Sequence, residues 1–351
     1  MKASQVIKTK EPLQIRELET PVAKGRQVLV EIESSGVCHS DIHVWEGGYE
    51  GKQGQIMRVE ERGVKFPLTL GHEIAGTVHS IGEEVKGVKN GDRVLVYPWI
   101  GDGTCNACQI GDEHVCDNPR SLGIFQNGGY AQKVLVPDEK YLVNIGNLDA
   151  NTVSSLACSG LTSFTAVKNS AVSPKQTLVI VGAGGLGLMG VQIARALLNP
   201  TIIVVDIDDK KLGEARKLGA DYIVNSFSEN AVNKIKELTF NQGADSIIDF
   251  VNSPKTVEPA LNMLRKRGKL VLVGLFGGSV ELSLPLLPLR SQTIIGSYTG
   301  RLADLADLVG LVKRKAVTPT ISKTFRLEEA NDALEQLKSG KILGRAVINP
   351  N

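Results

Sequence analysis

The sequence predicts an α/β protein in which an irregular all-β domain is joined to a doubly wound parallel-sheet domain. Residues 1 to about 150 hold short β-branched runs separated by turns, a pattern typical of an all-β domain. From about residue 151, apolar strands alternate with helices, which indicates a parallel sheet covered on both faces. A glycine-rich turn joins the first of these strands to the helix that follows it.

Composition excludes several classes of protein. The chain has 351 residues, enough for two domains, and 42% of them are hydrophobic and 22% charged, the balance of an ordinary globular protein. A net charge of +2 gives no reason to expect nucleic acid or an anionic membrane as partner. The N-terminus lacks the apolar core of a secretory signal, so we expect a cytoplasmic protein.

In the first part of the chain, four runs read as strands: residues 28–37, 76–81, 92–99 and 131–136. Two segments between the strands read as loops. Residues 47–63 are polar and glycine-rich, and we expect them to form an exposed loop. Residues 101–118 form a second loop that is dense in glycine, aspartate and cysteine.

The second part begins with residues 154–169, which look helical. Strands are expected at residues 177–183, 201–206, 222–225, 246–251 and 269–274, with helices at residues 187–198 and 210–220. From about residue 300 the pattern becomes helix, linker and a final strand at residues 344–349. We expect this tail to return to the first domain.

The glycine-rich turn has the form G-x-G-x-x-G, with glycines at Gly182, Gly184 and Gly187 around Gly185 and Leu186. It follows a predicted strand, opens a predicted helix and is followed by a strand that ends in Asp206, which is the context of a dinucleotide site. The helix N-terminus offers unpaired N–H groups to a pyrophosphate. Asp206 can bind the adenosine ribose and would repel a 2′-phosphate, so we predict NAD rather than NADP.

Three cysteines, Cys105, Cys108 and Cys116, lie close together in the second loop. An odd total of five cysteines argues against a disulfide framework, and reduced thiols at this spacing predict a structural zinc site. Such a site needs a fourth ligand. Asp102 and His114 are both candidates, and spacing barely decides between them.

The remaining cysteines, Cys38 and Cys158, lie in the segments GVCHSDIH and LACSGLTS, and GHEIAG between them contains His72 and Glu73. Two thiolates and one imidazole would form a three-ligand zinc site with an open position, as catalytic zinc requires. Their wide separation in sequence means that spacing does not prove this.

The GHE segment, followed by Gly76, Gly82 and Gly91-Asp92-Arg93-Val94, resembles the zinc signature of the medium-chain alcohol dehydrogenases. GVCHSD, the cysteine loop, VGAGGLG and the closing GRAVI resemble that family in the same order. The resemblance implies a GroES-like catalytic domain (residues 1–152 and 299–351) with a zinc lobe at residues 101–118, and an NAD-binding Rossmann domain at residues 153–298.

Segments around residues 59–73 and 97–108 are most similar to tetrameric archaeal and bacterial enzymes. The resemblance therefore implies a homotetramer. It also favours Asp102 over His114 as fourth ligand, because that subgroup has an acidic residue at this position.

The family resemblance also implies roles for individual residues. Cys38, His72 and Cys158 would hold a catalytic zinc, with Glu73 behind it or as an additional ligand. Ser40 would pass the alcohol proton, through the cofactor ribose, to His43, while Asp41 would orient His72. His39 and Arg345 are candidates for contact with the pyrophosphate, and Trp99 for the wall of the substrate pocket.

The function that the sequence predicts is reversible oxidation of primary or secondary alcohols to aldehydes or ketones by hydride transfer to NAD, with two zinc ions per subunit. A polyol dehydrogenase of the same family is the main alternative. A zinc-ribbon nucleic-acid module disagrees with the near-zero net charge, and a zinc-free quinone reductase typically lacks the ligands at positions 38, 72 and 158. A protein that kept the fold but lost catalysis disagrees with intact Cys38, His72, Cys158 and Ser40.

Overall fold

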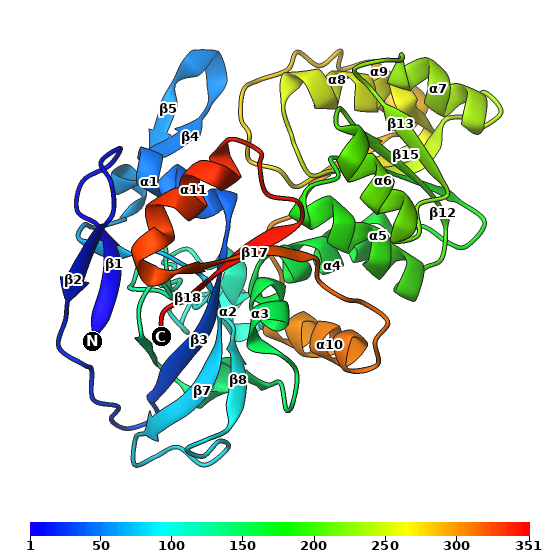
Figure 1. The fold of residues 1–351 in the computed structure, drawn as a ribbon. Helices are drawn as coiled ribbons and strands as arrows, with labels where there is room; N and C mark the ends of the chain where they lie inside the picture. The colour runs from blue at the N-terminus through cyan, green and yellow to red at the C-terminus, as the bar shows by residue number, and fades with distance from the viewer.

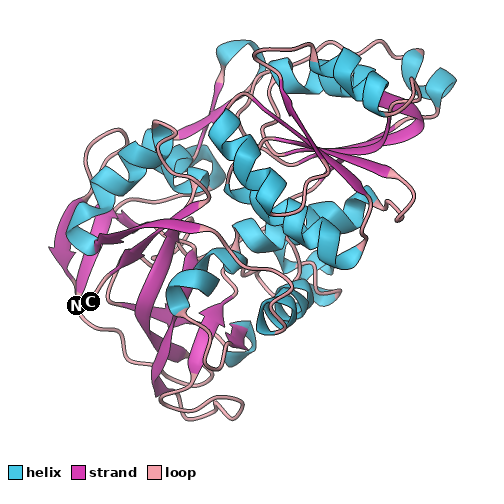
Figure 2. Ribbon diagram, turned by 45° about the vertical axis from the view of Figure 1, so that its right-hand side comes forward, coloured by secondary structure: helices cyan, strands magenta, loops and turns pink.

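The computed structural model describes all residues from 1 to 351, and the chain folds into two sheet-based lobes that lie side by side (Figure 1). One lobe is built mainly from antiparallel strands, and the other is a parallel sheet sandwiched between helices (Figure 2). The predicted α/β fold class is confirmed. None of the helices combines the length and the apolar character that a membrane crossing requires.

The larger sheet of the first lobe contains strands from the beginning and from the end of the chain. Its strands in spatial order are β10 (Leu142–Asn144), β8 (Arg93–Val96), β7 (Glu73–Ile81), β3 (Val28–Val37), β18 (Arg345–Asn349) and β17 (Ile321–Arg326), with β9 (Lys133–Val136) also paired to β3. Because Ala346 of β18 pairs with Val37 of β3, the last strand of the chain lies beside one of the first. A smaller sheet has the order β2 (Gln14–Glu17), β1 (Lys2–Val6) and β6 (Leu68–Thr69).

The parallel sheet of the second lobe has six strands. Their order is β13 (Tyr222–Asn225), β12 (Thr201–Asp206), β11 (Thr177–Val181), β14 (Ala244–Asp249), β15 (Leu264–Leu272) and β16 (Thr293–Gly296). This is the doubly wound order in which the direction of strand addition reverses between β11 and β14. Ligands of such sheets bind at the carboxyl ends of the strands at that point.

Side chains of β11 show why its sequence is apolar without alternation. Leu178 and Ile180 pack into the main core, while Val179 and Val181 face a second core on the opposite side of the sheet. The first face is covered by α4 (Ser159–Ser170), α5 (Gly185–Leu197) and α6 (Asp209–Lys217), and the second by α7 (Ala231–Leu238) and α8 (Pro254–Met263). A strand buried on both faces needs apolar residues throughout.

Six further helices complete the two lobes. They are α1 (His39–Glu46), α2 (Asn106–Gln109), α3 (Ala150–Val153), α9 (Leu286–Arg290), α10 (Leu302–Lys313) and α11 (Ala330–Lys338). The 3-10 turns are η1 (Lys52–Gly54), η2 (Glu60–Arg62), η3 (Glu113–Val115), η4 (Glu139–Tyr141), η5 (Ser154–Ala157) and η6 (Leu327–Glu329).

Two local expectations need correction. The segment from Gly47 to Gly63 is exposed, but it forms a hairpin of β4 (Gly48–Glu50) and β5 (Ile56–Arg58) rather than a loop. Its polar composition hid a ladder that is held by backbone hydrogen bonds. The helix expected at residues 154–169 is interrupted at Cys158, whose backbone (φ −127°, ψ −74°) separates η5 from α4.

Candidate active site

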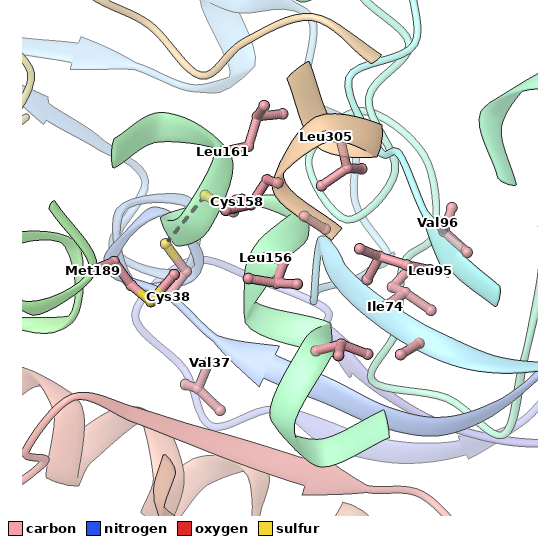
Figure 3. Packing of buried hydrophobic residues seen from close by; sticks show 14 of the residues in the cluster. Val37, Cys38, Ile74, Leu95, Val96, Leu156, Cys158, Leu161, Met189 and Leu305 are labelled. Carbon is pink, nitrogen blue, oxygen red and sulfur yellow. Dashed lines mark hydrogen bonds between the residues drawn. The ribbon is translucent and has the colours of Figure 1, made fainter. Parts of the chain in front are cut away.

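Four side chains, most of them distant in sequence, meet in the buried core: Cys38, His72, Glu73 and Cys158. Cys38 is the N-cap of α1, His72 immediately precedes β7, and Cys158 lies at the break before α4. Their ligand atoms all lie within 4.8 Å of one another, and the two Sγ atoms are 3.9 Å apart and face each other (Figure 3). Each predicted ligand thus lies at the end of a helix or strand, and these ends meet in the fold.

Asp41 fixes the orientation of His72. Its carboxylate accepts hydrogen bonds from the N–H of Cys38 at 2.9 Å, the N–H of Gly71 at 3.2 Å and the hydroxyl of Tyr130 at 3.0 Å, and its Oδ1 lies 3.2 Å from His72 Nδ1. His72 Nε2, in contrast, is buried without a hydrogen-bond partner. A nitrogen oriented in this way and left unpartnered beside two thiols is suited to bind a metal ion.

The electrostatics of the cluster also fit a cation. The hydrogen bond from Cys158 is the largest of the effects that hold the pKa of Cys38 well below its usual range, and the same interaction raises the pKa of Cys158. Burial lowers the pKa of His72, but Asp41 and Cys38 outweigh it, so the net shift is well upward. A zinc ion would take the place of these shared protons, because its ligands must be thiolates and neutral imidazole. Two thiolates and one imidazole leave an open coordination position.

Behind the cluster lies a buried ion pair between Glu73 and Arg345. Arg345 Nε donates to Glu73 Oε2 at 3.1 Å and Nη2 donates to Oε1, while the N–H of Ser159 donates to Oε1 at 3.1 Å. Gly36 on the adjacent strand makes room for this carboxylate, since a Cβ there would lie 1.9 Å from Glu73 Oε2. A Cβ on Gly185 would lie 3.4 Å from Arg345 Nη1, so the third nitrogen lies beside the glycine-rich turn.

The glycine-rich turn lies between β11 and α5, next to the switch point of the sheet. Gly182 has a φ of +94°, and a Cβ on Gly187 would lie 1.8 Å from the Gly182 carbonyl oxygen, so the turn requires both glycines. Space around Gly184 is open, and α5 begins directly after it. Asp206 ends β12, and its Oδ2 accepts from the N–H of Ala183 at 2.6 Å. The turn fits a pyrophosphate, and Asp206 stands beside it.

Helix α1 carries three further residues of the predicted site. Ser40 and His43 are three residues apart, so they lie on the same face of the helix, and both are half-buried. Burial lowers the pKa of His43, which keeps its ring neutral at pH 7 and able to accept a proton. His39 is exposed, and its ring lies 6.4 Å from that of Phe276 in the opposite lobe.

An aromatic wall stands next to the metal-type cluster. The ring of Trp99 lies 5.5 Å from the ring of His72 and 5.7 Å from Tyr298, which it meets edge-on. Trp99 is fixed by a hydrogen bond from its Nε1 to the Ala157 carbonyl oxygen at 2.9 Å. Tyr49 of the β4–β5 hairpin contacts His43 with 4.6 Å between ring centres.

The cysteine lobe holds the second cluster. Cys105 Sγ lies 3.6 Å from Cys108 Sγ and 3.7 Å from Cys116 Sγ. Asp102 belongs to this cluster with its ligand atom within 4.8 Å of the others, whereas His114 lies outside it. The Asp102 carboxylate accepts from the N–H groups of Thr104 and Cys105, and these contacts, with that from Asn118, lower its pKa. The geometry favours Asp102 over His114.

Comparison with known proteins identifies the family. The alcohol dehydrogenase GroES-like domain matches residues 24–147, and the zinc-binding dehydrogenase domain matches residues 185–314. The chain is 44% identical over 351 residues to an NAD-dependent alcohol dehydrogenase of Sulfurisphaera tokodaii and 42% identical to one of Saccharolobus solfataricus, with full coverage of both proteins in each case.

The chain belongs to the zinc-dependent alcohol dehydrogenase family. The family resemblance expected from the GHE segment is thus confirmed. Among solved structures, the alcohol dehydrogenase of the hyperthermophilic archaeon Aeropyrum pernix matches with a TM-score of 0.91 and 32% identity over the whole of both chains. A D-arabinose 1-dehydrogenase (NADP(+)) of Saccharolobus solfataricus is also similar, at 35% identity over 99% of this chain and 97% of that protein.

The sequence did not predict a role for several residues of this candidate site. Tyr130 contacts Asp41, Gly36 makes room for Glu73, and Tyr49 lies beside His43. Each acts through a contact made only in the folded protein. The one local signal was at Gly36, because a glycine inside a strand often marks a close approach.

The Glu73–Arg345 pair generates a stability prediction. Arg345→Met should lower the free energy of unfolding by about 3–5 kcal/mol, because it leaves a buried carboxylate without its partner. The double variant Glu73→Gln/Arg345→Met should recover part of that loss, because no charge then remains buried alone. Urea unfolding of both variants and the wild type tests this, and a single variant as stable as the wild type would contradict it.

The lobe generates a second prediction. Cys105→Ala should remove one zinc per subunit and lower the Tm by roughly 5 °C or more, because a structural ligand set is broken. Calorimetry and metal analysis measure both effects. An unchanged Tm together with lost turnover would speak against a structural role for the lobe.

Proposed function

We propose that this enzyme oxidises primary or secondary alcohols to aldehydes or ketones with NAD as hydride acceptor, and runs the reverse reaction as well. The observation that carries the proposal is the cluster of Cys38, His72 and Cys158, where the unpartnered Nε2 of His72 faces two thiols next to an aromatic wall. Full-length relatives named as NAD-dependent alcohol dehydrogenases support it.

Cys38, His72 and Cys158 would hold the catalytic zinc, with Glu73 behind them. When bound, zinc supplies Lewis-acid chemistry that makes an alcohol hydroxyl more acidic, and NAD accepts the hydride. Asp41 keeps His72 in the tautomer that presents Nε2 to the cluster. Arg345 donates hydrogen bonds to the Glu73 carboxylate and balances its charge, so Glu73 adds no unpaired charge to the site.

Ser40 and His43 are proposed to carry the proton of the alcohol away. They share a half-buried face of α1, the helix that begins directly after Cys38, and His43 is neutral at pH 7. A neutral imidazole can accept the proton that a serine hydroxyl relays. Trp99 is proposed to line the substrate pocket, since its ring lies against His72.

Gly182, Gly184, Gly185, Leu186 and Gly187 are proposed to hold the pyrophosphate at the N-terminus of α5. Asp206, at the end of β12, would bind the adenosine ribose and repel a 2′-phosphate. Arg345 Nη1, beside Gly185, and the exposed His39 are proposed to contact the cofactor as well.

The second zinc is proposed to occupy the lobe with Cys105, Cys108, Cys116 and Asp102 as ligands, a closed set with a structural role. We also propose that residues 1–152 and 299–351 act as the catalytic domain and residues 153–298 as the cofactor domain, in a cytoplasmic homotetramer. Leu284 and Leu289, both highly exposed near the edge strand β16, support self-association.

A polyol or sugar dehydrogenase is less well supported. At 35% identity, the D-arabinose relative is more distant than the NAD-dependent alcohol dehydrogenases at 42% and 44%, and it is named for NADP(+), a cofactor that Asp206 would disfavour.

Cys38→Ala tests the catalytic cluster. The variant should fold and bind NADH but lose turnover by about a thousandfold or more, because an open zinc site with one thiolate missing no longer activates the alcohol. Cofactor fluorescence, metal content and turnover with an alcohol panel are the measurements. Retained turnover would remove the proposed role of the cluster.

Asp206→Gly tests the cofactor preference. The ratio of kcat/KM with NADP to that with NAD should rise about tenfold or more, because a like-charge contact with the 2′-phosphate disappears. Asp206→Asn is the matched control, because it removes the charge but keeps an acceptor for the Ala183 N–H. If neither variant changes the ratio, discrimination lies elsewhere in the site.

A further inference from the structure

A cation stands beside the aromatic wall without an acidic partner. Arg62 ends the 3-10 turn that follows the β4–β5 hairpin, and its guanidinium carbon lies 5.4 Å from the centre of the Tyr49 ring. Tyr49 in turn contacts His43, so it connects Arg62 to the face of α1 that carries the proposed proton route. The hairpin lies beside the second lobe (Figure 1), where the N–H of Gly278 donates to the Glu50 carbonyl oxygen at 3.2 Å.

Arg62 and the thiols of the zinc-type cluster influence the pKa values of the same two tyrosines, Tyr49 and Tyr298. The pKa of Tyr298, which burial raises, is also influenced by Tyr49, by Arg62 and by the thiols of Cys38 and Cys158. The pKa of Tyr49 is raised mainly by burial, and both Arg62 and Cys38 act on it. Trp99 contacts both His72 and Tyr298. Tyr49 contacts His43 and Arg62, so aromatic rings lie beside the metal-type cluster and beside Arg62.

The guanidinium of Arg62 is free to bind an anion. It makes no ion pair, although Glu60 and Glu61 precede it directly, and its exposed side chain lies over the Tyr49 ring. Two other acidic residues of this region make contacts elsewhere. Glu46 pairs with Lys338 at 2.7 Å, and the backbone of Glu50 contacts the opposite lobe. An unpaired guanidinium presents a planar fork that matches a carboxylate.

We propose that the preferred substrates are aromatic alcohols whose ring carries a carboxylate, with the ring between Trp99, Tyr49 and Tyr298 and the carboxylate on Arg62. This inference rests on the proposed alcohol dehydrogenase function. Flat aromatic walls favour a planar substrate body through offset and edge-on contacts. The reaction itself is unchanged: the CH₂OH group loses a hydride to NAD and a proton to the relay, and becomes an aldehyde, while the carboxylate takes no part.

Three probes test the proposal: benzyl alcohol, 4-(hydroxymethyl)benzoate and the methyl ester of the latter. The wild type should favour the carboxylate over its neutral ester in kcat/KM by about fivefold, the effect of one partly exposed ion pair. This preference should shrink as salt is added, because salt screens an exposed charge pair. The ratio of two substrates in one preparation is independent of how much protein is folded.

Arg62→Gln should reduce the carboxylate-to-ester ratio to about one, and Arg62→Lys should keep part of it, because lysine retains the charge but not the fork. Arg58→Gln is the matched control: Arg58 is an exposed cation in the same hairpin, and its loss should leave the ratio at the wild-type value.

The results separate this inference from the function on which it rests. Turnover of benzyl alcohol with NAD, without preference for the carboxylate, would overturn the role of Arg62 and leave the alcohol dehydrogenase proposal standing. An unchanged ratio in Arg62→Gln would also overturn it. Failure of all three probes, and of simple aliphatic alcohols with them, would instead count against the proposed function.

Discussion

Burial of charge in the core is the constraint on which the rest of the site depends. Glu73 and Arg345 are almost fully buried, so each is tolerable only while the other is in place. The pair requires β7 and β18 to flank β3 and requires a glycine at position 36. Asp41 obeys the same rule, because four partners satisfy its buried carboxylate and one of them is the ring that presents Nε2 to the thiols. The positions of the candidate ligands are therefore set by the need to satisfy their buried neighbours.

The same pair connects the two lobes. Arg345 belongs to the antiparallel sheet, but its third nitrogen lies beside Gly185 at the start of α5. One side chain thus contacts the carboxylate behind the metal-type cluster and borders the turn proposed to hold the pyrophosphate. An arginine suits this position better than lysine, because its planar guanidinium has several nitrogens that can contact Glu73 and the glycine-rich turn at the same time.

Local patterns predicted the parts of the fold that depend on local sequence. Apolar strands, helix starts and the motif at Gly182 were located because their periodicity and turn chemistry lie within a few residues. The cluster of Cys38, His72 and Cys158 depended on family resemblance, since nothing in the spacing brings those residues together. The contacts of Tyr130 and Gly36 were missed because they exist only after β3, β7 and the loop before β9 have packed. The β4–β5 hairpin was missed because its ladder is made by the backbone of a polar segment.

The pairing of β18 with β3 has a consequence for how the protein is made. Ala346 of β18 pairs with Val37 of β3, so this part of the sheet can close only after all of the chain between them has been made. The parallel-sheet lobe, whose strands are contiguous in sequence, can form earlier, as domains generally do during synthesis. Until the final strand arrives, Glu73 lacks its arginine and the edge of β3 stays open to solvent. The docking of β18 therefore follows synthesis of the parallel-sheet lobe, and it joins the two lobes and completes the floor of the site.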